Sequence, residues 1–138
     1  LIRIYPQIFL LFNSYQLSVS LEYDGITVAG ISAGISGSAS NQLNSPYHLA
    51  LDAIGSLYIC DRSNHRIQKY LKDATSGTTV AGIKSGAYGS LPVDLHFPSS
   101  ILLDSSNNIY VADTSNNRIQ FWAPNAPNGT TILSGNTS

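Results

Sequence analysis

The sequence has no methionine, a single cysteine and few charged side chains: Asp, Glu, Lys and Arg together make up 11% of its 138 residues. One cysteine cannot form an intrachain disulfide, and it excludes zinc sites built on paired cysteines. The net charge is −1 and no run of lysines and arginines occurs, which argues against binding to a nucleic-acid phosphate backbone. The polar surface must therefore come from Ser, Thr, Asn and Gly, a composition typical of turn-rich β structure.

The sequence also lacks a hydrophobic run long enough to span a bilayer, because its most apolar stretch covers only residues 8–12. Arg3 before that stretch and the small residues Ser18 and Ser20 after it resemble the end of a secretory signal. The alternative interpretation is a diverged pair of strands from an earlier repeat. Residues 1–24 are therefore set apart as an N-terminal segment, and the compartment stays unknown, with secretion slightly favoured.

From residue 25 onward the chain repeats itself with a shift of 52 positions. The sequence TVAGI at residues 27–31 recurs at residues 79–83, and the Tyr-containing run at residues 57–60 corresponds to residues 109–112. The match needs no gap. Such a repeat indicates one supersecondary unit used twice.

Each unit is predicted to form four short strands, because short apolar or β-branched runs alternate with clusters of turn residues. Four antiparallel strands in a unit of this length are typical of a β-propeller blade. We therefore predict an all-β partial propeller over residues 25–138. It has two four-stranded blades, at about residues 46–82 and 98–134, and one extra outer strand before them at residues 26–30.

The connection after the second strand of each unit carries a recognisable signature, DRSNHRIQ at residues 61–68 and DTSNNRIQ at residues 113–120. It resembles the NHL repeat, and the resemblance covers roughly residues 27–134. It implies a fragment of a propeller, usually six-bladed, of a family that mostly provides binding scaffolds. The sequence departs from the family at His48 and Ser100, where a glycine is usual.

Three polar residues recur in both units, which gives six in all, and they are predicted to brace the blade corners. An Asp in this place can accept backbone N–H bonds from the turn and pair with the Arg five residues later. The Asn between them suits a left-handed turn position. Recurrence favours architecture, because an active site needs asymmetry. The six are Asp61, Asn64, Arg66, Asp113, Asn116 and Arg118.

Function is expected among the positions that fail to repeat. Antiparallel strands alternate in direction, so the connections at residues 62–65 and 114–117 share one face with the long segments 31–45 and 83–97. Loops on a rigid scaffold normally carry recognition. We therefore predict a face that binds a protein or a small ligand, with no nucleic acid and no cofactor. The candidate contacts are Arg62, His65, Tyr88 and His96.

The alternative is part of a propeller enzyme, a metal-dependent lyase or hydrolase completed by further blades. Some enzymes with similar repeats hold zinc through histidines, and His48, His65 and His96 are the candidates here. Stoichiometric zinc or calcium would favour this alternative. No catalytic or metal-binding residue is assigned, because the counterparts of these histidines in the other unit are Ser100, Asn117 and Asn44.

Two further expectations concern packing. Cys60 lies within a strand, at the position that Ala112 occupies in the second repeat. It is predicted to be a small buried residue rather than a reactive thiol. Two blades cannot close a ring, so the exposed sheet faces should be covered by other blades or by self-association.

Overall fold

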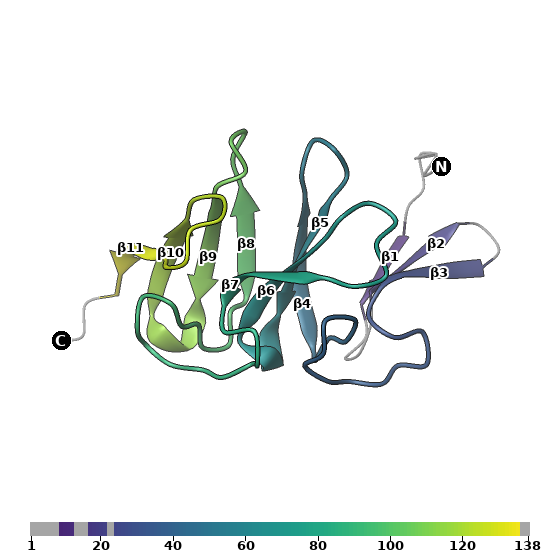
Figure 1. The fold of residues 1–138 in the computed structure, drawn as a ribbon, viewed down its shortest axis with the longest axis horizontal. Helices are drawn as coiled ribbons and strands as arrows, with labels where there is room; N and C mark the ends of the chain where they lie inside the picture. The colour runs from purple at the N-terminus through teal and green to yellow at the C-terminus, as the bar shows by residue number, and fades with distance from the viewer. Residues whose placement is uncertain (1–8, 13–16, 22–23, 136–138) are drawn as a thin grey trace.

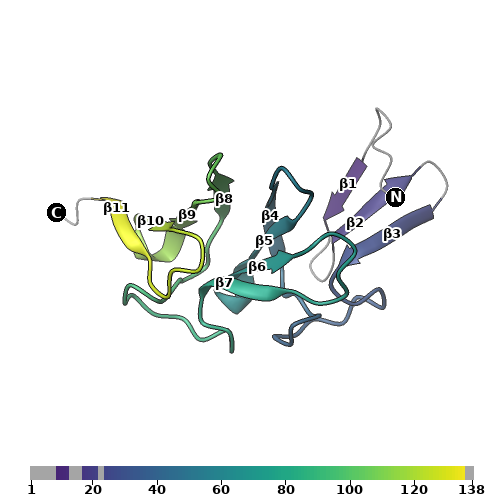
Figure 2. The ribbon, with the colours of Figure 1, turned by 45° about the horizontal axis from the view of Figure 1, so that its top comes forward.

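Three antiparallel sheets follow one another along the chain in the computed structural model, which describes residues 9–12, 17–21 and 24–135 (Figure 1). The first sheet contains β1 (Phe9–Phe12), β2 (Leu17–Leu21) and β3 (Asp24–Ala29). The second, blade one, contains β4 (Pro46–Leu51), β5 (Leu57–Asp61), β6 (Arg66–Tyr70) and β7 (Thr78–Gly82). The third, blade two, contains β8 (Ser100–Leu103), β9 (Ile109–Asp113), β10 (Arg118–Trp122) and β11 (Thr130–Ser134). Figure 2 shows the three sheets fanned side by side.

The all-β partial propeller predicted from the repeat is confirmed, with two four-stranded antiparallel blades. The leading strand is β3, and it pairs antiparallel with β2, which in turn pairs with β1. These two partners lie in the N-terminal segment for which a signal remnant and a diverged strand pair were the two interpretations. Both are strands of the first sheet.

No helix in the described part of the chain is long and apolar enough to span a membrane. Helical geometry occurs there as two short 3₁₀ turns, η1 (Arg62–Asn64) and η2 (Thr114–Asn116). Each follows the second strand of its blade and leads into the third.

The hairpins between the first two strands of each blade are held by an aspartate. Asp52 Oδ1 accepts the backbone N–H groups of Ile54 and Ser56, at 3.1 and 2.8 Å, and Asp104 does the same in blade two. Gly55 has a φ of 85° in the first hairpin, and Asn107 takes its place with a φ of 61°. Asn replaces Gly without loss of the turn, since Asn tolerates the left-handed region better than most side chains do.

The main core lies between the two blades. Tyr58, Cys60 and Ile67 on one face of blade one pack against the inner face of blade two, where Val111 and Trp122 are fully buried. The other face of blade one packs towards β3 in a smaller core made of Ala29, Leu43, Ile59 and Tyr70, with Val28, Leu49 and Leu57 at its margin. Blade one is thus covered on both faces, which makes it a rigid support for the loops at its ends.

Candidate functional site

The long segments 31–45 and 83–97 and the two 3₁₀ turns lie at one end of the blades, along the lower edge of Figure 1. The hairpin turns between the first two strands lie at the opposite end. We call the end that carries the long segments the loop face. It is the face on which the sequence predicted recognition.

Blade one holds its part of the loop face through a buried Asp61–Arg66 pair. Arg66 Nε donates to Asp61 Oδ2 at 2.7 Å, and the two side chains are 1% and 0% exposed. The terminal nitrogens of Arg66 donate to four backbone carbonyl oxygens, those of Ser38, Ala39, Gln42 and Lys84. One guanidinium thereby fixes both neighbouring loop segments to the blade corner.

The Asp61 carboxylate has three donors around it. The Asn44 N–H donates to Oδ1 at 2.7 Å, and Asn64 Nδ2 donates to Oδ2 at 2.9 Å, in addition to Arg66. Burial raises the pKa of the Asp61 carboxyl, while these three hydrogen bonds act in the opposite direction. A carboxylate held in this way supports a bracing role, because it has little capacity left for a ligand.

Blade two repeats the arrangement. Arg118 Nε donates to Asp113 Oδ2 at 2.7 Å, and its terminal nitrogens hold segment 83–97 through backbone carbonyls. Asn116 Nδ2 donates both to Asp113 Oδ2, at 2.8 Å, and to the Gly89 carbonyl oxygen, at 2.7 Å. The same three residue types therefore lock the loop before each blade.

The prediction that Asn64 and Asn116 occupy left-handed turn positions is wrong. The positive φ angles fall one residue later, at His65 and Asn117, both with a φ of 51°. Each Asn lies inside its 3₁₀ turn and uses its amide to bond the aspartate and the preceding loop. Asn is needed here as a two-way hydrogen-bond donor rather than as a residue that tolerates positive φ.

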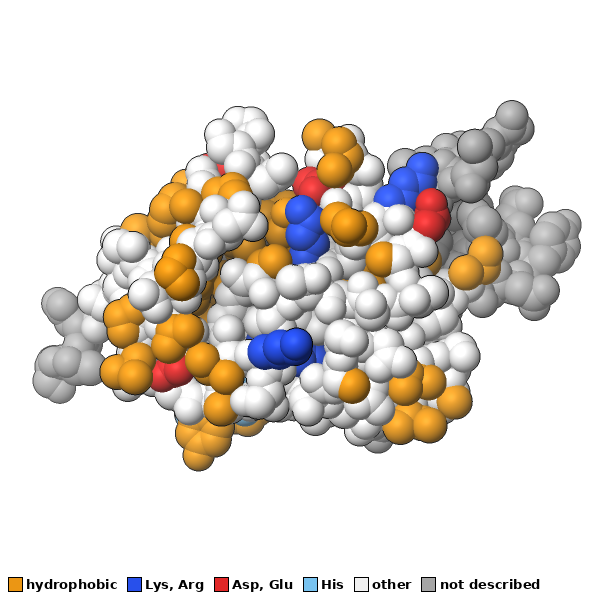
Figure 3. Space-filling view, viewed as in Figure 1, with side chains coloured by type: hydrophobic (Ala, Val, Ile, Leu, Met, Phe, Trp, Pro, Cys, Tyr) orange, Lys and Arg blue, Asp and Glu red, His pale blue; other side chains and the backbone are white. Residues whose placement is uncertain are grey.

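The structure brings together the four loop-face residues that the sequence singled out. The His65 ring centroid lies 5.1 Å from that of Tyr88 and 5.4 Å from that of His96. Tyr88 and His96 stack at 4.6 Å with an interplanar angle of 18°. Arg62 joins the group through the Phe97 ring, which packs edge-on against His65 at 4.5 Å. In Figure 3 a histidine and hydrophobic side chains come together at the lower edge of the molecule.

Two members of this group were missed in the sequence, Tyr47 and Phe97. Arg62 Cζ lies 5.5 Å from the Tyr47 ring centroid and 5.1 Å from that of Phe97. The sequence contained a signal that could have identified them, because both are aromatic where the other unit has a serine, Ser99 for Tyr47 and Ser45 for Phe97. We call these six residues the aromatic cluster: Tyr47, Arg62, His65, Tyr88, His96 and Phe97.

Backbone contacts fix the cluster across the boundary between the blades. The Phe97 N–H donates to His65 Nδ1 at 3.0 Å, which sets the imidazole orientation and leaves Nε2 to carry the proton in the neutral ring. The His96 N–H donates to Asp113 Oδ1 at 2.7 Å, and its carbonyl accepts from the Ser115 N–H. The rings are thus placed by the same corner networks that shape the blades.

The surroundings of His65 disfavour the charged form of its imidazole. Burial lowers the pKa of His65, and the nearby His96 and Arg62 lower it further, whereas Asp113 acts in the opposite direction. The fold therefore favours the neutral imidazole of His65, with the fixed charge of Arg62 beside it.

Phe97 is an unusual choice for its backbone position. Its φ is 47°, a left-handed conformation that is costly for a bulky side chain. Ser45, the residue at the same place in the preceding repeat, has a φ of 50°, so the fold itself imposes the conformation. A large aromatic ring at such a position suggests that the ring serves a purpose other than local folding.

The three histidines do not come together as a group of three potential metal ligands in the described structure. His48 Nδ1 accepts the Ile101 N–H at 3.3 Å, and His65 and His96 contact each other through their rings. Among residues 9–12, 17–21 and 24–135, no group of three metal-ligating side chains occurs. Cys60 is fully buried, and burial raises the pKa of its thiol to about 12.

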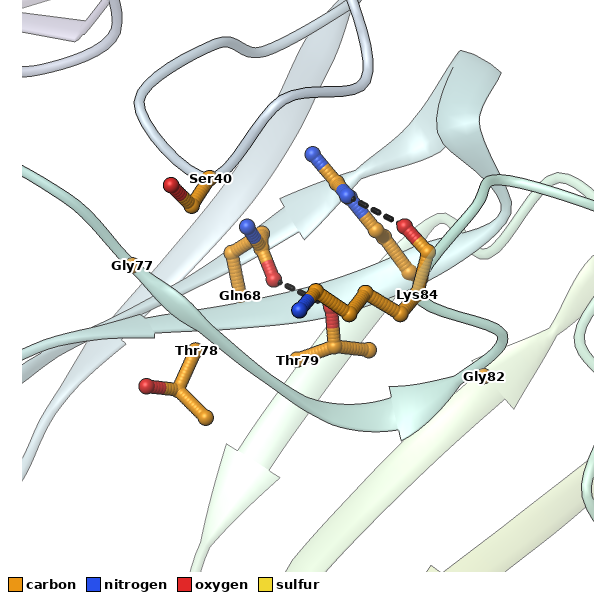
Figure 4. A pocket seen from close by; sticks show the side chains of 8 residues that line it. Ser40, Gln68, Gly77, Thr78, Thr79, Gly82 and Lys84 are labelled. Carbon is orange, nitrogen blue, oxygen red and sulfur yellow. Dashed lines mark hydrogen bonds between the residues drawn. The ribbon is translucent and has the colours of Figure 1, made fainter.

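A second candidate is a polar pocket between β6, β7 and segment 31–45 (Figure 4). Two of its side chains are paired with each other: the Thr79 hydroxyl donates to Gln68 Oε1 at 2.7 Å, and blade two repeats this bond between Thr131 and Gln120. Repetition favours a structural link between the outer strands. The lining residues are Ser40, Arg66, Gln68, Gly77, Thr78, Thr79, Gly82 and Lys84.

Comparison with known proteins agrees with the geometry of the blades. The family model of the NHL repeat matches residues 43–70 and residues 95–121. Each match starts shortly before the first strand of a blade and ends within or at the third strand. No curated protein matches the chain.

Proposed function

We propose that this chain, two segments of which match the NHL-repeat model, is a non-catalytic propeller scaffold that binds a protein or a ligand on its loop face. The aromatic cluster is the single observation that carries this proposal. Its members come from segments that are far apart in the sequence, and they meet at the boundary between blade one and blade two.

The cluster is set apart from the scaffold by its failure to repeat. All six of its positions are occupied by Ser, Thr or Asn in the other unit, where the counterparts are Ser99, Thr114, Asn117, Ser36, Asn44 and Ser45. The corner network, by contrast, recurs residue for residue. Aromatic and arginine side chains are enriched at binding surfaces, and Tyr88 and Tyr47 remain 65% and 62% exposed.

A second surface would associate with other blades. The face of blade two directed away from blade one is uncovered and carries apolar side chains, among them Leu102, Ile119 and Leu133. We propose that it packs against a further propeller blade or against a second copy of the chain. The equivalent face of blade one is already covered by blade two in this way.

The loop-face proposal can be tested with random peptides displayed on phage and selected on the full chain. Tyr88→Ser combined with His96→Asn installs the residues found at the equivalent repeat positions, Ser36 and Asn44. Selected peptides should lose binding to this double variant. They should keep binding to Ile54→Ser, which changes a side chain that is 75% exposed in a hairpin turn at the opposite end.

Failure to enrich any peptide, or enrichment of peptides that bind both variants equally, would contradict the proposal. Circular dichroism of each variant distinguishes loss of the site from loss of the fold.

A further inference from the structure

Arg62 stands between two aromatic rings that belong to different blades. Tyr47 lies at the start of β4 in blade one, and Phe97 lies just before β8 in blade two. The guanidinium carbon is 5.5 and 5.1 Å from the two ring centroids. Contacts with aromatic rings at these distances hold a guanidinium by cation–π attraction and do not use its N–H donors.

Those donors have no partner in the described part of the protein. The Arg62 side chain makes no hydrogen bond or ion pair there. By contrast, the two arginines of the corner network, Arg66 and Arg118, donate hydrogen bonds from Nε and from both terminal nitrogens. A guanidinium has five N–H donors in a planar fork. The fold therefore positions Arg62 and leaves its N–H groups available to a ligand.

The neighbouring carboxylates cannot neutralise it. Asp61, which directly precedes Arg62, is committed to Arg66, Asn64 and the Asn44 N–H. Asp113 is committed in the same way and contributes Oδ1 to the His96 backbone. Both are fully buried, so the charge that the cluster offers to solvent is that of Arg62.

We propose that Arg62 is the anchor for a carboxylate of an acidic peptide, with the exposed ring of Tyr88, stacked on His96, forming the adjacent wall for an apolar side chain of the same peptide. The planar fork of an arginine matches a carboxylate in a bidentate manner. This inference rests on the proposed function of the loop face and names the chemistry of the partner.

A peptide carboxylate fits the site better than a phosphate source does. It carries one negative charge, which equals the one uncompensated cation of the cluster. A phosphate dianion needs more than one cation to balance its charge, and a nucleic acid needs a series of cations along its backbone. The net charge of the chain is −1, and the described loop face offers no such series near Arg62.

The site is confined to one blade boundary. Blade two has Thr114 where blade one has Arg62, and Ser99 where blade one has Tyr47. The chain therefore offers its own control: Arg62→Thr gives blade one the residue that blade two already accommodates at that position, so the fold should tolerate it.

The test uses the peptides selected on the full chain, resynthesised with a fluorescent label, and measures their affinity by anisotropy. The selected peptides should share an Asp or Glu, and changing it to the amide should weaken binding to the wild type about 10-fold, the size expected for a charge-assisted bond. On Arg62→Thr the acid and amide forms should bind equally. Arg62→Lys should restore part of the difference, because it keeps the charge and lacks the fork.

Peptides that depend on Tyr88 and His96 but share no acidic residue would overturn the carboxylate inference and leave the proposed function standing. Absence of any loop-face peptide would overturn both. If changing the peptide's acid to the amide weakens its binding equally to the wild type and to Arg62→Thr, the carboxylate does not contact Arg62 and the inference is overturned. Tighter binding of a phosphoserine version of the peptide, or of an oligo-dT strand, would overturn it in favour of a phosphate ligand.

Discussion

Blade one and blade two have the same strand order and the same corner network, but they differ in what covers them. Tyr58, Cys60 and Ile67 on blade one are buried beneath blade two. Ile119, at the place of Ile67, is only partly buried, and Leu133 at the place of Ala81 is 65% exposed. Position within the array, rather than the repeated sequence, therefore decides how much each residue contributes to stability.

The corner network allows the sharpest test of this difference. Arg66→Met should lower the free energy of unfolding by about 3–5 kcal/mol, because it leaves Asp61 buried without its charged partner and frees both neighbouring loops. Arg118→Met should cost less, because the Arg118 side chain is 11% exposed, against 1% for Arg66. Urea unfolding of both variants measures the difference, with Arg66→Lys as the charge-conserving control. Equal losses of unfolding free energy in Arg66→Met and Arg118→Met would show that the deeper burial of Arg66 does not make its corner more important for stability.

A smaller effect is expected from the paired core isoleucines. Ile67→Ala should destabilise the chain by about 2–4 kcal/mol, since Ile67 is fully buried between the blades. Ile119→Ala should cost about 1 kcal/mol or less, because nothing in the described structure packs over that face of blade two as blade two packs over Ile67. The two variants make the same chemical change in the same strand position. The comparison is made at a protein concentration low enough to keep the chain monomeric, where similar midpoints in urea would contradict the predicted difference in packing.

The uncovered face of blade two should cause self-association of the isolated chain. Light scattering should detect species larger than the monomer, and Leu102→Lys with Leu133→Lys should reduce them, since these side chains are 64% and 65% exposed on that face. Leu71→Lys is the matched control, since Leu71 is 59% exposed but lies in a turn after β6. A monodisperse, cooperatively melting wild-type monomer would refute the prediction.

The smallest expected effect is a dependence of stability on pH that only blade one carries. The pKa of His65 is lowered in the fold by burial and by the facing His96 and Arg62, with Asp113 acting against them and the Tyr88 ring also in contact. The fold therefore favours the neutral imidazole. Its contribution is present above the ordinary pKa of about 6.5 and is lost as the pH falls from there through the folded-state value.

His65→Asn introduces the residue of blade two, Asn117, and should flatten this dependence between about pH 7.5 and 5.5. Thermal melts of the wild type and the variant across that range provide the measurement. Parallel pH profiles for the two proteins would assign the dependence to other groups.

Much of the scaffold could be predicted because it repeats. The four-strand blades and the Asp–Arg pairs are local features, and each occurs in both copies of the repeat. The place of Asn64 in its turn was misassigned, since residue type alone does not distinguish a left-handed backbone from a side-chain donor one residue earlier.

The sequence by itself determined that there are two blades of one kind and that the recurring Asp, Asn and Arg lie at their corners. It also predicted that recognition by this chain lies among the residues that do not recur. Only the tertiary structure decided that Tyr47 and Phe97 enclose Arg62, and that β1 and β2 complete a sheet with β3. The physical reason is that hydrogen bonds within a repeat follow from short sequence spacing. Contacts between side chains of different blades depend instead on how the sheets pack together, which no local pattern encodes.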